Sequence, residues 1–393
     1  METPVGCEIN GFHNILKEKN TIVFLLLCEI FVPLITEMKG KMSQDNFFAE
    51  KLLAWYDVHR RELPWRGEKD VYRVWVSEII LQQTQVVQGW DYYRRFVERF
   101  PSVESLAEAR EDEVMKLWEG LGYYSRARNL HAAAQQVMAD GGVFPRTYEG
   151  VRALKGVGDY TAGAICSLAY GLPVAAVDGN GFRVLTRCFA INEAVDTAVG
   201  QRMVKALAQE LIDEQRAGDF NQAMMDLGAM VCTPRPQCEI CPLNEICEAY
   251  ARGDMAAFPR KRGKTKVVER RMAYVKVVQG DHVLIRRRNS KDVWRGLYEY
   301  VLVEPDESDS EIDLMKDKVC SLLWQPNRGI LKPIRKGVKH VLSHRKLIVD
   351  FYMLDLPEHA IVSEEISAAG YFWVSREHLD DYAFPALYAK VNL

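Results

Sequence analysis

Apolar residues recur at intervals of three and four positions along the first half of the chain. This spacing runs through residues 46–60, 71–87, 112–121, 127–140 and 204–215, and Gly, Pro or Asp residues separate the segments. An α-helix brings positions with this spacing to one face, which can then pack against a core. The region from Phe47 to about Tyr250 is therefore predicted to be an all-helical domain.

The pattern changes after Cys247. Residues 260–271 hold seven Lys or Arg residues against one acidic residue, Glu269, which indicates a basic linker. Farther on, residues 271–288 form two β-rich runs joined at residues 279–281, and this is a hairpin signal. The remaining pattern predicts strands over 297–304 and 346–356 and a helix over 309–324.

These patterns predict a multidomain fold that is all-helical first and α+β afterwards. A chain of 393 residues is long enough for two such domains. The predicted boundaries are a helical domain over 43–250 with a cysteine-rich loop at 232–247, a basic linker over 251–270 and an α+β domain over 271–393.

Residues 1–42 differ in character from the rest of the chain. Their apolar stretch, 21–36, is interrupted by Glu29 and Pro33, and it is short for a membrane-spanning helix, which needs about 20 apolar residues. Lysines precede it as in a signal peptide, but no small-x-small cleavage site follows. We favour a third interpretation, in which Met42 is the natural start and the preceding residues are not translated.

Composition narrows the class of protein. An apolar content of 48% and a charged content of 27% are those of an ordinary soluble protein. The formal net charge of -3 gives no overall sign of nucleic-acid binding, so any such surface must be a local basic patch. Of the nine cysteines, four crowd into residues 232–247. That distribution favours a metal site in a reducing compartment over a disulfide scaffold.

The four crowded cysteines are the first candidate for chemistry. Four thiolates within one short loop satisfy a tetrahedral zinc site or a cubane iron–sulfur cluster, and the spacing alone does not choose between them. Because all four coordination positions are taken, a structural role is expected in either case. The residues are Cys232, Cys238, Cys241 and Cys247.

The stretch LKGVGDYTAGA, residues 154–164, joins two predicted helices. Gly156 and Gly158 permit positive φ and leave backbone N–H groups uncovered beside a helix N-terminus, a geometry that binds phosphate. A purely structural turn between helices is the alternative.

Two acidic residues form a second candidate site. Glu78 shares a helical face with Val, Trp and Leu side chains, so its pKa should be raised and its carboxyl group could donate a proton near neutral pH. Asp178 ends an apolar run and precedes Gly-Asn-Gly and a new helix, where a helix N-cap is the plain interpretation. Glu78 could equally be a surface carboxylate. Together the two fit the pair of carboxyl groups that breaks glycosidic bonds.

Several stretches of the helical region match one family. They resemble the helix-hairpin-helix DNA glycosylases, and specifically the MutY adenine glycosylases, from about residue 44 to near residue 390. The resemblance implies an enzyme that removes adenine mispaired with 8-oxoguanine or with guanine. The matching stretches are LPWR (63–66), WVSEIILQQTQV (75–86), WEGLGYYSRARNLH (118–131), LKGVGDYTAGAI (154–165), VDGN (177–180) and FNQAMMDLGAMVCTPRPQC (220–238).

The resemblance also implies a role for each matching residue. Glu78 would protonate the adenine, and Asp178 would stabilise the oxocarbenium-like sugar or a transient adduct to it. Tyr160 and Asn180 would keep the site in order, and the four cysteines would bind a 4Fe–4S cluster. The hairpin glycines would grip the DNA backbone. Residues expected at the 8-oxoguanine are Gln83, Thr84, Leu121 and Tyr123, and those expected in the adenine pocket are Trp65, Arg66 and Gln222.

The α+β region resembles the Nudix-like domain of the same family, which helps to recognise 8-oxoguanine. The acidic Nudix helix does not follow Gly296, so pyrophosphohydrolysis is not expected. At 342–344 the family loop reads Phe-Ser-His, whereas this chain has Leu342, Ser343 and His344. Leu342 can wedge but cannot stack. The first two cluster cysteines are separated by five residues in place of the usual six, which tightens a loop expected to face DNA.

Three other functions fit the sequence less well than adenine removal. An endonuclease III-like glycosylase with lyase activity needs an amine nucleophile, but Tyr160 stands where that relative has lysine, and Lys155 lies across the hairpin. A non-catalytic DNA-binding protein would not need both Glu78 and Asp178. A Nudix hydrolase would need the acidic helix. We expect a monomer that acts on double-stranded DNA in the bacterial cytoplasm, at the nucleoid, without membrane contact.

Overall fold

The computed structural model describes most of the chain after the N-terminal segment. The described residues are 45–263, 267–290, 292–305, 312–324, 329–342, 344–357 and 364–391. The interpretation of residues 1–42 and the role expected of Ser343 therefore lie outside the described residues. Within them, no helix is long and apolar enough to cross a membrane.

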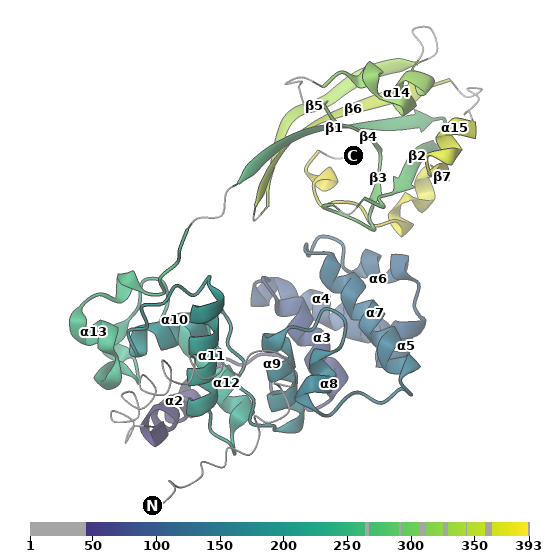
Figure 1. Cartoon of the computed structure of the whole chain (residues 1–393). Coiled ribbons are helices and arrows are strands. Elements are labelled where there is room, and N and C mark those ends of the chain that lie inside the picture. The colour runs from purple at the N-terminus through teal and green to yellow at the C-terminus, as the bar shows by residue number, and fades with distance from the viewer. Residues whose placement is uncertain are drawn as a thin grey trace, which may run out of the picture.

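The first part of the chain is all-helical, as the periodicity predicts (Figure 1). The helices are α2 (Asp45–His59), α3 (Val71–Leu81), α4 (Val86–Arg99), α5 (Val103–Glu108), α6 (Glu111–Leu117), α7 (Ser125–Ala139), α8 (Tyr148–Arg152), α9 (Asp159–Tyr170), α10 (Gly179–Cys188), α11 (Ala198–Leu211), α12 (Ala217–Met230) and α13 (Glu248–Arg252).

These helices pack into two groups with separate apolar cores. One core holds the buried side chains of α3, α4, α6, α7 and α9, and the other holds those of α2, α10, α11 and α12. Figure 1 shows the two groups side by side, with α9 between them. The seam between the two groups is where a cavity can form without opening either core.

The C-terminal part forms a seven-stranded sheet in the described residues. Its strands are β1 (Val268–Gln279), β2 (His282–Arg287), β3 (Tyr298–Glu299), β4 (Val301–Val303), β5 (Ile330–Val341), β6 (Arg345–Leu356) and β7 (Tyr371–Ser375). The main order is β3-β2-β1-β6-β5, with β4 paired to β1 and β7 to β2. β1 and β6 run parallel, whereas the other pairs are antiparallel. The predicted α+β fold class is thus confirmed.

The predicted hairpin after the linker is present, since β1 pairs with β2 across Gly280, whose φ is +55°. The prediction of one continuous helix over 309–324 is wrong. The described residues of this segment form a 3-10 turn (Leu314–Lys316) and then the short helix α14 (Lys318–Leu323). Asp317 separates the two because its side chain accepts a hydrogen bond from the backbone N–H of Cys320 and so begins a new helix.

Successive side chains of β1 point to opposite faces of the sheet, and both faces are buried. Met272 and Tyr274 point into the apolar cluster that also contains the core of α3–α9. Ala273 and Val275 point to the opposite face, which α14 and α15 (Glu364–Ala368) cover. One apolar cluster therefore spans both domains.

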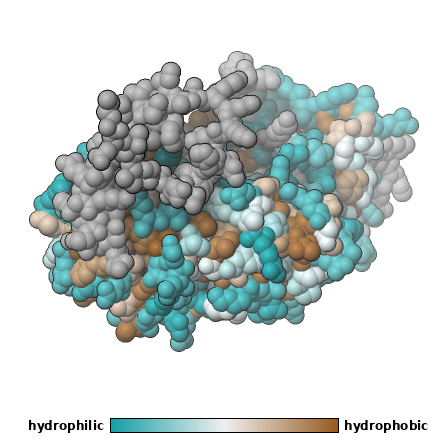
Figure 2. Space-filling model, turned by 60° about the horizontal axis from the view of Figure 1, so that its bottom comes forward, coloured by the Kyte–Doolittle hydropathy of each residue, from teal (hydrophilic) through white to brown (hydrophobic). Residues whose placement is uncertain are grey.

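Polar contacts from α6 and the turn after it fix the sheet domain against the helical domain. The Tyr298 hydroxyl donates to Asp112 Oδ2 at 3.0 Å, and the backbone N–H of Phe384 donates to Glu119 Oε1 at 2.7 Å. An ion pair of 2.9 Å joins Arg287 to Glu111. On the face shown in Figure 2, hydrophilic side chains predominate among the described residues and apolar ones gather in small patches.

A buried ion pair inside the sheet domain gives a test of its stability. Arg288 and Glu299 are 3% and 1% exposed and lie 2.6 Å apart. We expect Glu299→Gln to lower the free energy of unfolding by about 3 kcal/mol, because a buried guanidinium loses the closer of its two charged partners. Urea denaturation of the full chain measures this loss.

The matched control is Asp219→Asn, which removes a partner of Arg216 at an exposed pair. Its effect should stay below about 1 kcal/mol, since water screens exposed pairs. Equal losses in the two variants would contradict the assignment of the buried pair as the stronger interaction.

Candidate active site

A cavity of about 520 Å³ opens at the seam between the two helical groups. All the residues predicted to be catalytic or adenine-binding line it, together with two of those predicted at the lesion, Gln83 and Thr84. The predicted residues that line it are Trp65, Arg66, Glu78, Gln83, Thr84, Tyr160, Asp178, Asn180 and Gln222.

Glu78 lies in the last turns of α3, where apolar neighbours leave it 8% exposed. Its Oε2 accepts a hydrogen bond of 2.9 Å from the hydroxyl of Tyr160 on α9. The pKa of Glu78 is raised to about 7, chiefly by burial; the hydrogen bond from Tyr160 lowers it and the charge of Asp178 raises it. A carboxyl group with this pKa keeps much of its proton near neutral pH and can donate it there.

Tyr160 is fixed in place by more than this one bond. Its hydroxyl also lies 3.5 Å from the sulfur of Met225. Burial raises the pKa of Tyr160 well above its usual value, so the phenol stays protonated and continues to donate to Glu78.

Asp178 is both the N-cap of α10 and a wall residue of the cavity. Its Oδ1 accepts from the backbone N–H of Gly181 at 2.8 Å, and its Oδ2 accepts from Asn180 Nδ2 at 2.8 Å. The N-cap role does not exclude a functional role for Asp178, because the capping hydrogen bonds hold its carboxylate at a fixed place beside the cavity.

Arg183 supports this arrangement, and the sequence analysis missed it. Its Nη2 donates to Asn180 Oδ1 and to the Gly228 carbonyl, both at 2.7 Å, and its Nε donates to the Cys232 carbonyl at 2.7 Å. Gly228 lets α12 approach α10 closely, since a Cβ there would lie 2.5 Å from that of Asn180. The signal available in the sequence was the position of Arg183 one turn after Asn180.

Asp226 and Tyr56 were also not predicted from the sequence. Asp226 is fully buried and accepts two hydrogen bonds from Arg66, at 2.6 and 2.8 Å. Arg61 donates to the same carboxylate at 2.7 Å. The Tyr56 hydroxyl donates to Gln222 Oε1 at 2.6 Å. These contacts fix the wall that contains Arg66 and Gln222.

Two linked turns have strained backbones, and the first of them lines the cavity. Gln83 has φ of +54° and Tyr123 has φ of +47°, a region that residues other than glycine rarely adopt. Arg126 joins the turns: its guanidinium donates to the carbonyls of Ile80 and Gly122, at 2.9 and 3.2 Å. The turn residue Leu121 is buried in the apolar core and lines neither large cavity.

The glycine hairpin precedes α9 on the surface. Gly156 has φ of +76°, and a Cβ there would lie 2.5 Å from that of Asn129, so only glycine fits. Gly158 is the N-cap of α9 with open space around it. The α9 N-terminus can therefore receive an anion such as a phosphate group.

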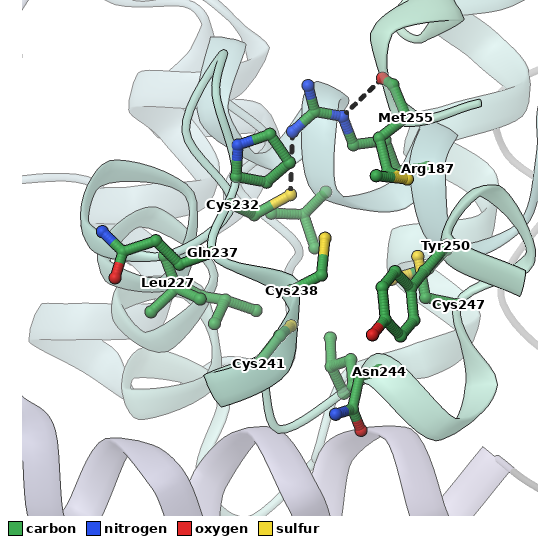
Figure 3. A pocket seen from close by; sticks show the side chains of 15 residues that line it. Arg187, Leu227, Cys232, Gln237, Cys238, Cys241, Asn244, Cys247, Tyr250 and Met255 are labelled. Atoms are coloured by element: carbon green, nitrogen blue, oxygen red, sulfur yellow. Dashed lines mark hydrogen bonds between the residues drawn. The ribbon is translucent and has the colours of Figure 1, made fainter. Parts of the chain in front are cut away.

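The four clustered cysteines line one small cavity (Figure 3). A fifth, Cys188 of α10, also lines it and was not predicted. Arg187 Nη1 lies 3.4 Å from Cys232 Sγ. Within the described residues, no three His, Cys, Asp or Glu side chains form a group that could hold a metal ion as they stand. The four thiols facing one cavity nevertheless supply the donor set of a four-thiolate cofactor, and a neighbouring cation favours such an anionic group.

A second cavity, also of about 520 Å³, lies between the helical and sheet domains. Three more of the residues predicted near the lesion line it: Tyr123 from the helical domain and Leu342 and His344 from the sheet domain. The predicted lesion contacts are thus divided between two cavities.

The buried carboxyl group of Glu78 gives a pH-dependent test of stability. Its pKa rises from the usual 4.5 to about 7 on folding, so the folded state holds the proton more tightly and its stability falls as pH rises between these values. We expect Glu78→Gln to remove this loss. Its stability relative to the unaltered protein should rise by up to about 3 kcal/mol between pH 4.5 and pH 8.

Urea denaturation across that pH range measures the difference. Glu98→Gln, at a carboxylate that is 74% exposed, is the control and should show no such gain. A pH-independent difference for Glu78→Gln would mean that folding does not raise the pKa of Glu78.

Comparison with known proteins places these features in a family. Residues 76–214 match the family described as HhH-GPD superfamily base excision DNA repair protein, and residues 273–392 match the NUDIX domain. The Adenine DNA glycosylase of Mus musculus is 36% identical over 404 residues, which cover 88% of this chain and 77% of that protein. The Adenine DNA glycosylase of Schizosaccharomyces pombe is 32% identical and the match covers 85% and 86% of the two chains.

A solved structure is similar to the helical domain. The structure of a thermostable thymine-DNA glycosylase superposes with a TM-score of 0.51 and 30% identity, covering 54% of this chain and 99% of that one. The resemblance inferred from the motifs is therefore confirmed over both domains. On the length and identity of these matches, the chain belongs to the adenine DNA glycosylase family.

Proposed function

We propose that this protein excises adenine from DNA where adenine is mispaired with 8-oxoguanine, and also with guanine. The observation that carries the proposal is the buried carboxyl group of Glu78, whose pKa is about 7, in a cavity of about 520 Å³. Family membership supports adenine as the base that is removed.

Adenine must leave the base stack before a side chain inside the protein can reach it. The cavity at the helical seam has room for a flipped nucleoside, and its wall contains the aromatic ring of Trp65 and the amide of Gln222. Adenine is a poor leaving group until it is protonated. Glu78, protonated at neutral pH, would donate that proton to a ring nitrogen.

The bond between the sugar and the base would then break with its electron pair moving to the protonated adenine. The sugar would carry positive charge at C1′, and the fixed carboxylate of Asp178 would stabilise it or form a transient adduct with it. Water would add to C1′ and return a proton to Glu78. The products are free adenine and an abasic site.

The geometry does not favour a lyase step. A Schiff base needs an amine, whereas Tyr160 presents a phenol that is already engaged with Glu78. Lys155 lies outside the residues that line the cavity. An endonuclease III-like activity on oxidised pyrimidines is the second candidate and is less well supported for this reason.

Double-stranded DNA is the proposed partner of a monomeric enzyme. The hairpin of Gly156 and Gly158 would bind a backbone phosphate, and Gln83, Thr84 and Tyr123 would enter the helix beside the mispair. Leu342 and His344 would face the 8-oxoguanine in the second cavity. We propose a reducing, DNA-bearing compartment, the bacterial cytoplasm, as the location.

Cys232, Cys238, Cys241 and Cys247 would hold a 4Fe–4S cluster. Bound there, the cluster would cross-link the loop through four iron–thiolate bonds. Arg183 connects the loop to the active site, because it bonds the Cys232 carbonyl and Asn180. A cross-linked loop would thereby help to keep α10 and the Asp178 cap in place.

Substitution of Glu78 tests the proposed acid. On an 8-oxoguanine:adenine duplex, Glu78→Gln should slow adenine release by at least about 100-fold, while duplex binding persists because the side-chain shape is kept. Release by the unaltered protein should decline above about pH 7, as the carboxyl group loses its proton. Single-turnover assays across pH measure both effects.

Glu98→Gln is again the control and should release adenine at the unaltered rate. Unchanged release by Glu78→Gln would refute the proposed acid. High-yield borohydride trapping of the protein on abasic-site DNA would instead favour the lyase alternative.

Metal analysis tests the proposed cluster. The purified chain should contain about four iron and four sulfide ions and absorb visible light broadly. Cys238→Ser should lose both, whereas Cys320→Ser, on α14 of the sheet domain, should retain them. Stoichiometric zinc without iron would show that the four thiolates form a zinc site.

A further inference from the structure

The cavity between the domains depends on two segments of the sheet domain. One contains residues 292–295, after β2, and the other contains residues around the junction of β5 and β6, including Leu342, His344 and Arg345. The helical domain contributes Tyr123 and its neighbours from the opposite side. The position of the two segments relative to each other therefore sets the shape of one cavity wall.

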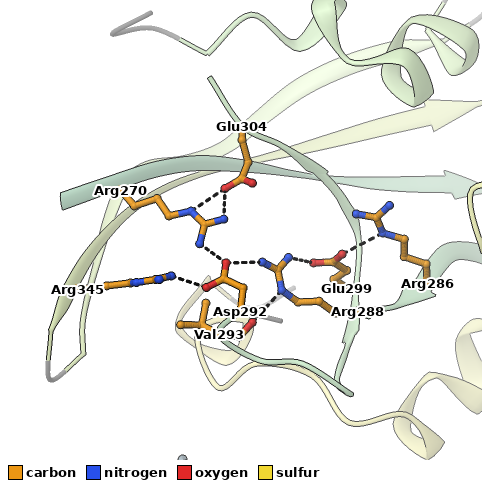
Figure 4. Close-up of polar contacts among 8 residues, drawn as sticks. All are labelled: Arg270, Arg286, Arg288, Asp292, Val293, Glu299, Glu304 and Arg345. Atoms are coloured by element: carbon orange, nitrogen blue, oxygen red, sulfur yellow. Dashed lines mark hydrogen bonds and ion pairs between the residues drawn. The ribbon is translucent and has the colours of Figure 1, made fainter. Parts of the chain in front are cut away.

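Asp292 is the point at which these segments meet (Figure 4). Its Oδ1 forms an ion pair with Arg345, and its Oδ2 pairs with Arg270 on β1. Arg288, at the end of β2, lies 3.2 Å from the same Oδ2. Figure 4 shows the carboxylate between the three guanidinium groups. Burial raises the pKa of Asp292, but Arg270, the backbone N–H of Val293 and Arg345 outweigh it and lower the pKa to about 2, so the group is ionised.

Further contacts connect the ion pairs of Asp292 to the residues of the cavity wall. The backbone N–H of Leu342 donates to the Arg345 carbonyl at 2.7 Å, which closes the turn that contains the cavity residue His344. In the other segment, the Trp294 ring lies 5.7 Å from the ring of His340. The two segments are thus joined by an ion pair at one end and by a ring contact at the other.

The ion pair with Arg345 is the contact that no neighbour can replace among the described residues. Arg270 also pairs with Glu304, and Arg288 also pairs with Glu299. Asp292 is the one carboxylate that the described residues offer Arg345. Loss of its charge would therefore free the Arg345 side chain first. The turn that carries Leu342 and His344 would keep its backbone hydrogen bonds but lose its ionic link to residues 292–295.

We propose that Asp292 is a positioning residue for recognition of the base opposite the target adenine: through Arg345, it holds Leu342 and His344 at the cavity between the domains. The inference rests on the proposed function, because that function supplies 8-oxoguanine as the ligand. Leu342 cannot stack on a base as a phenylalanine can, so its contribution depends on bulk held in a fixed place. An ionic anchor next to the turn supplies that constraint.

The test compares dissociation constants for two duplexes of one sequence. Both carry 2′-fluoro-2′-deoxyadenosine, which resists cleavage, opposite either 8-oxoguanine or guanine. The readout is the ratio of the two constants, which a general loss of stability or of phosphate contacts would not change. The variants are Asp292→Asn, Arg345→Gln, the double variant and Glu304→Gln. Glu304→Gln is the matched control, since Glu304 touches Arg270 in the same network but neither segment of the cavity wall.

Asp292→Asn and Arg345→Gln should each reduce the preference for 8-oxoguanine by about fivefold or more, and the double variant should reduce it no further. Glu304→Gln should change the ratio by less than about twofold. Arg345→Gln keeps Asp292 paired with Arg270 and Arg288, so it tests the same link if Asp292→Asn fails to fold.

Two results would overturn the inference alone: an unchanged ratio in a folded Asp292→Asn or Arg345→Gln variant, or an equal reduction in Glu304→Gln. A ratio of one in the unaltered protein would overturn the proposed recognition of 8-oxoguanine itself, together with this inference. Adenine release from a guanine:adenine duplex by the unaltered protein separates that case from a failure of the whole proposed function.

Discussion

The cost of ionising a largely buried carboxyl group determines the character of the candidate active site. Glu78 sits in the last turns of α3 among apolar side chains, and its pKa of about 7 follows first from that burial. The surrounding structure has to keep water away while leaving room for a substrate. The two helical groups achieve this because each has its own apolar core, and the cavity lies at their seam.

Local patterns in the sequence predicted most of the fold for a physical reason. Helical periodicity and strand alternation report which face of an element is buried, and that property belongs to each segment alone. The helix predicted over 309–324 failed because apolar spacing does not register a capping side chain. Asp317 begins a new helix without disturbing the spacing.

The sequence predicted the motif residues of the candidate site but not the side chains that hold them in place. Glu78, Tyr160, Asp178 and Asn180 were marked by their motifs, and the structure brings all four to one cavity. Arg183, Asp226 and Asp292 were missed because their partners are distant in sequence or come from several elements, as with the contact between Arg61 and Asp226. A spacing pattern identifies the buried face of a helix or strand, but it does not identify which distant side chains will contact that face.

α6 and the turn after it hold the sheet domain against the helical domain, and this contact affects how a mispair would be recognised. Because one apolar cluster spans both domains, the two large cavities belong to a single framework. In the proposed reaction, the flipped adenine would lie in the cavity at the helical seam, while residues of both cavities would contact the 8-oxoguanine. Recognition of one base would therefore be coupled through the shared framework to the placement of the other, and both would have to fit before the bond is cut.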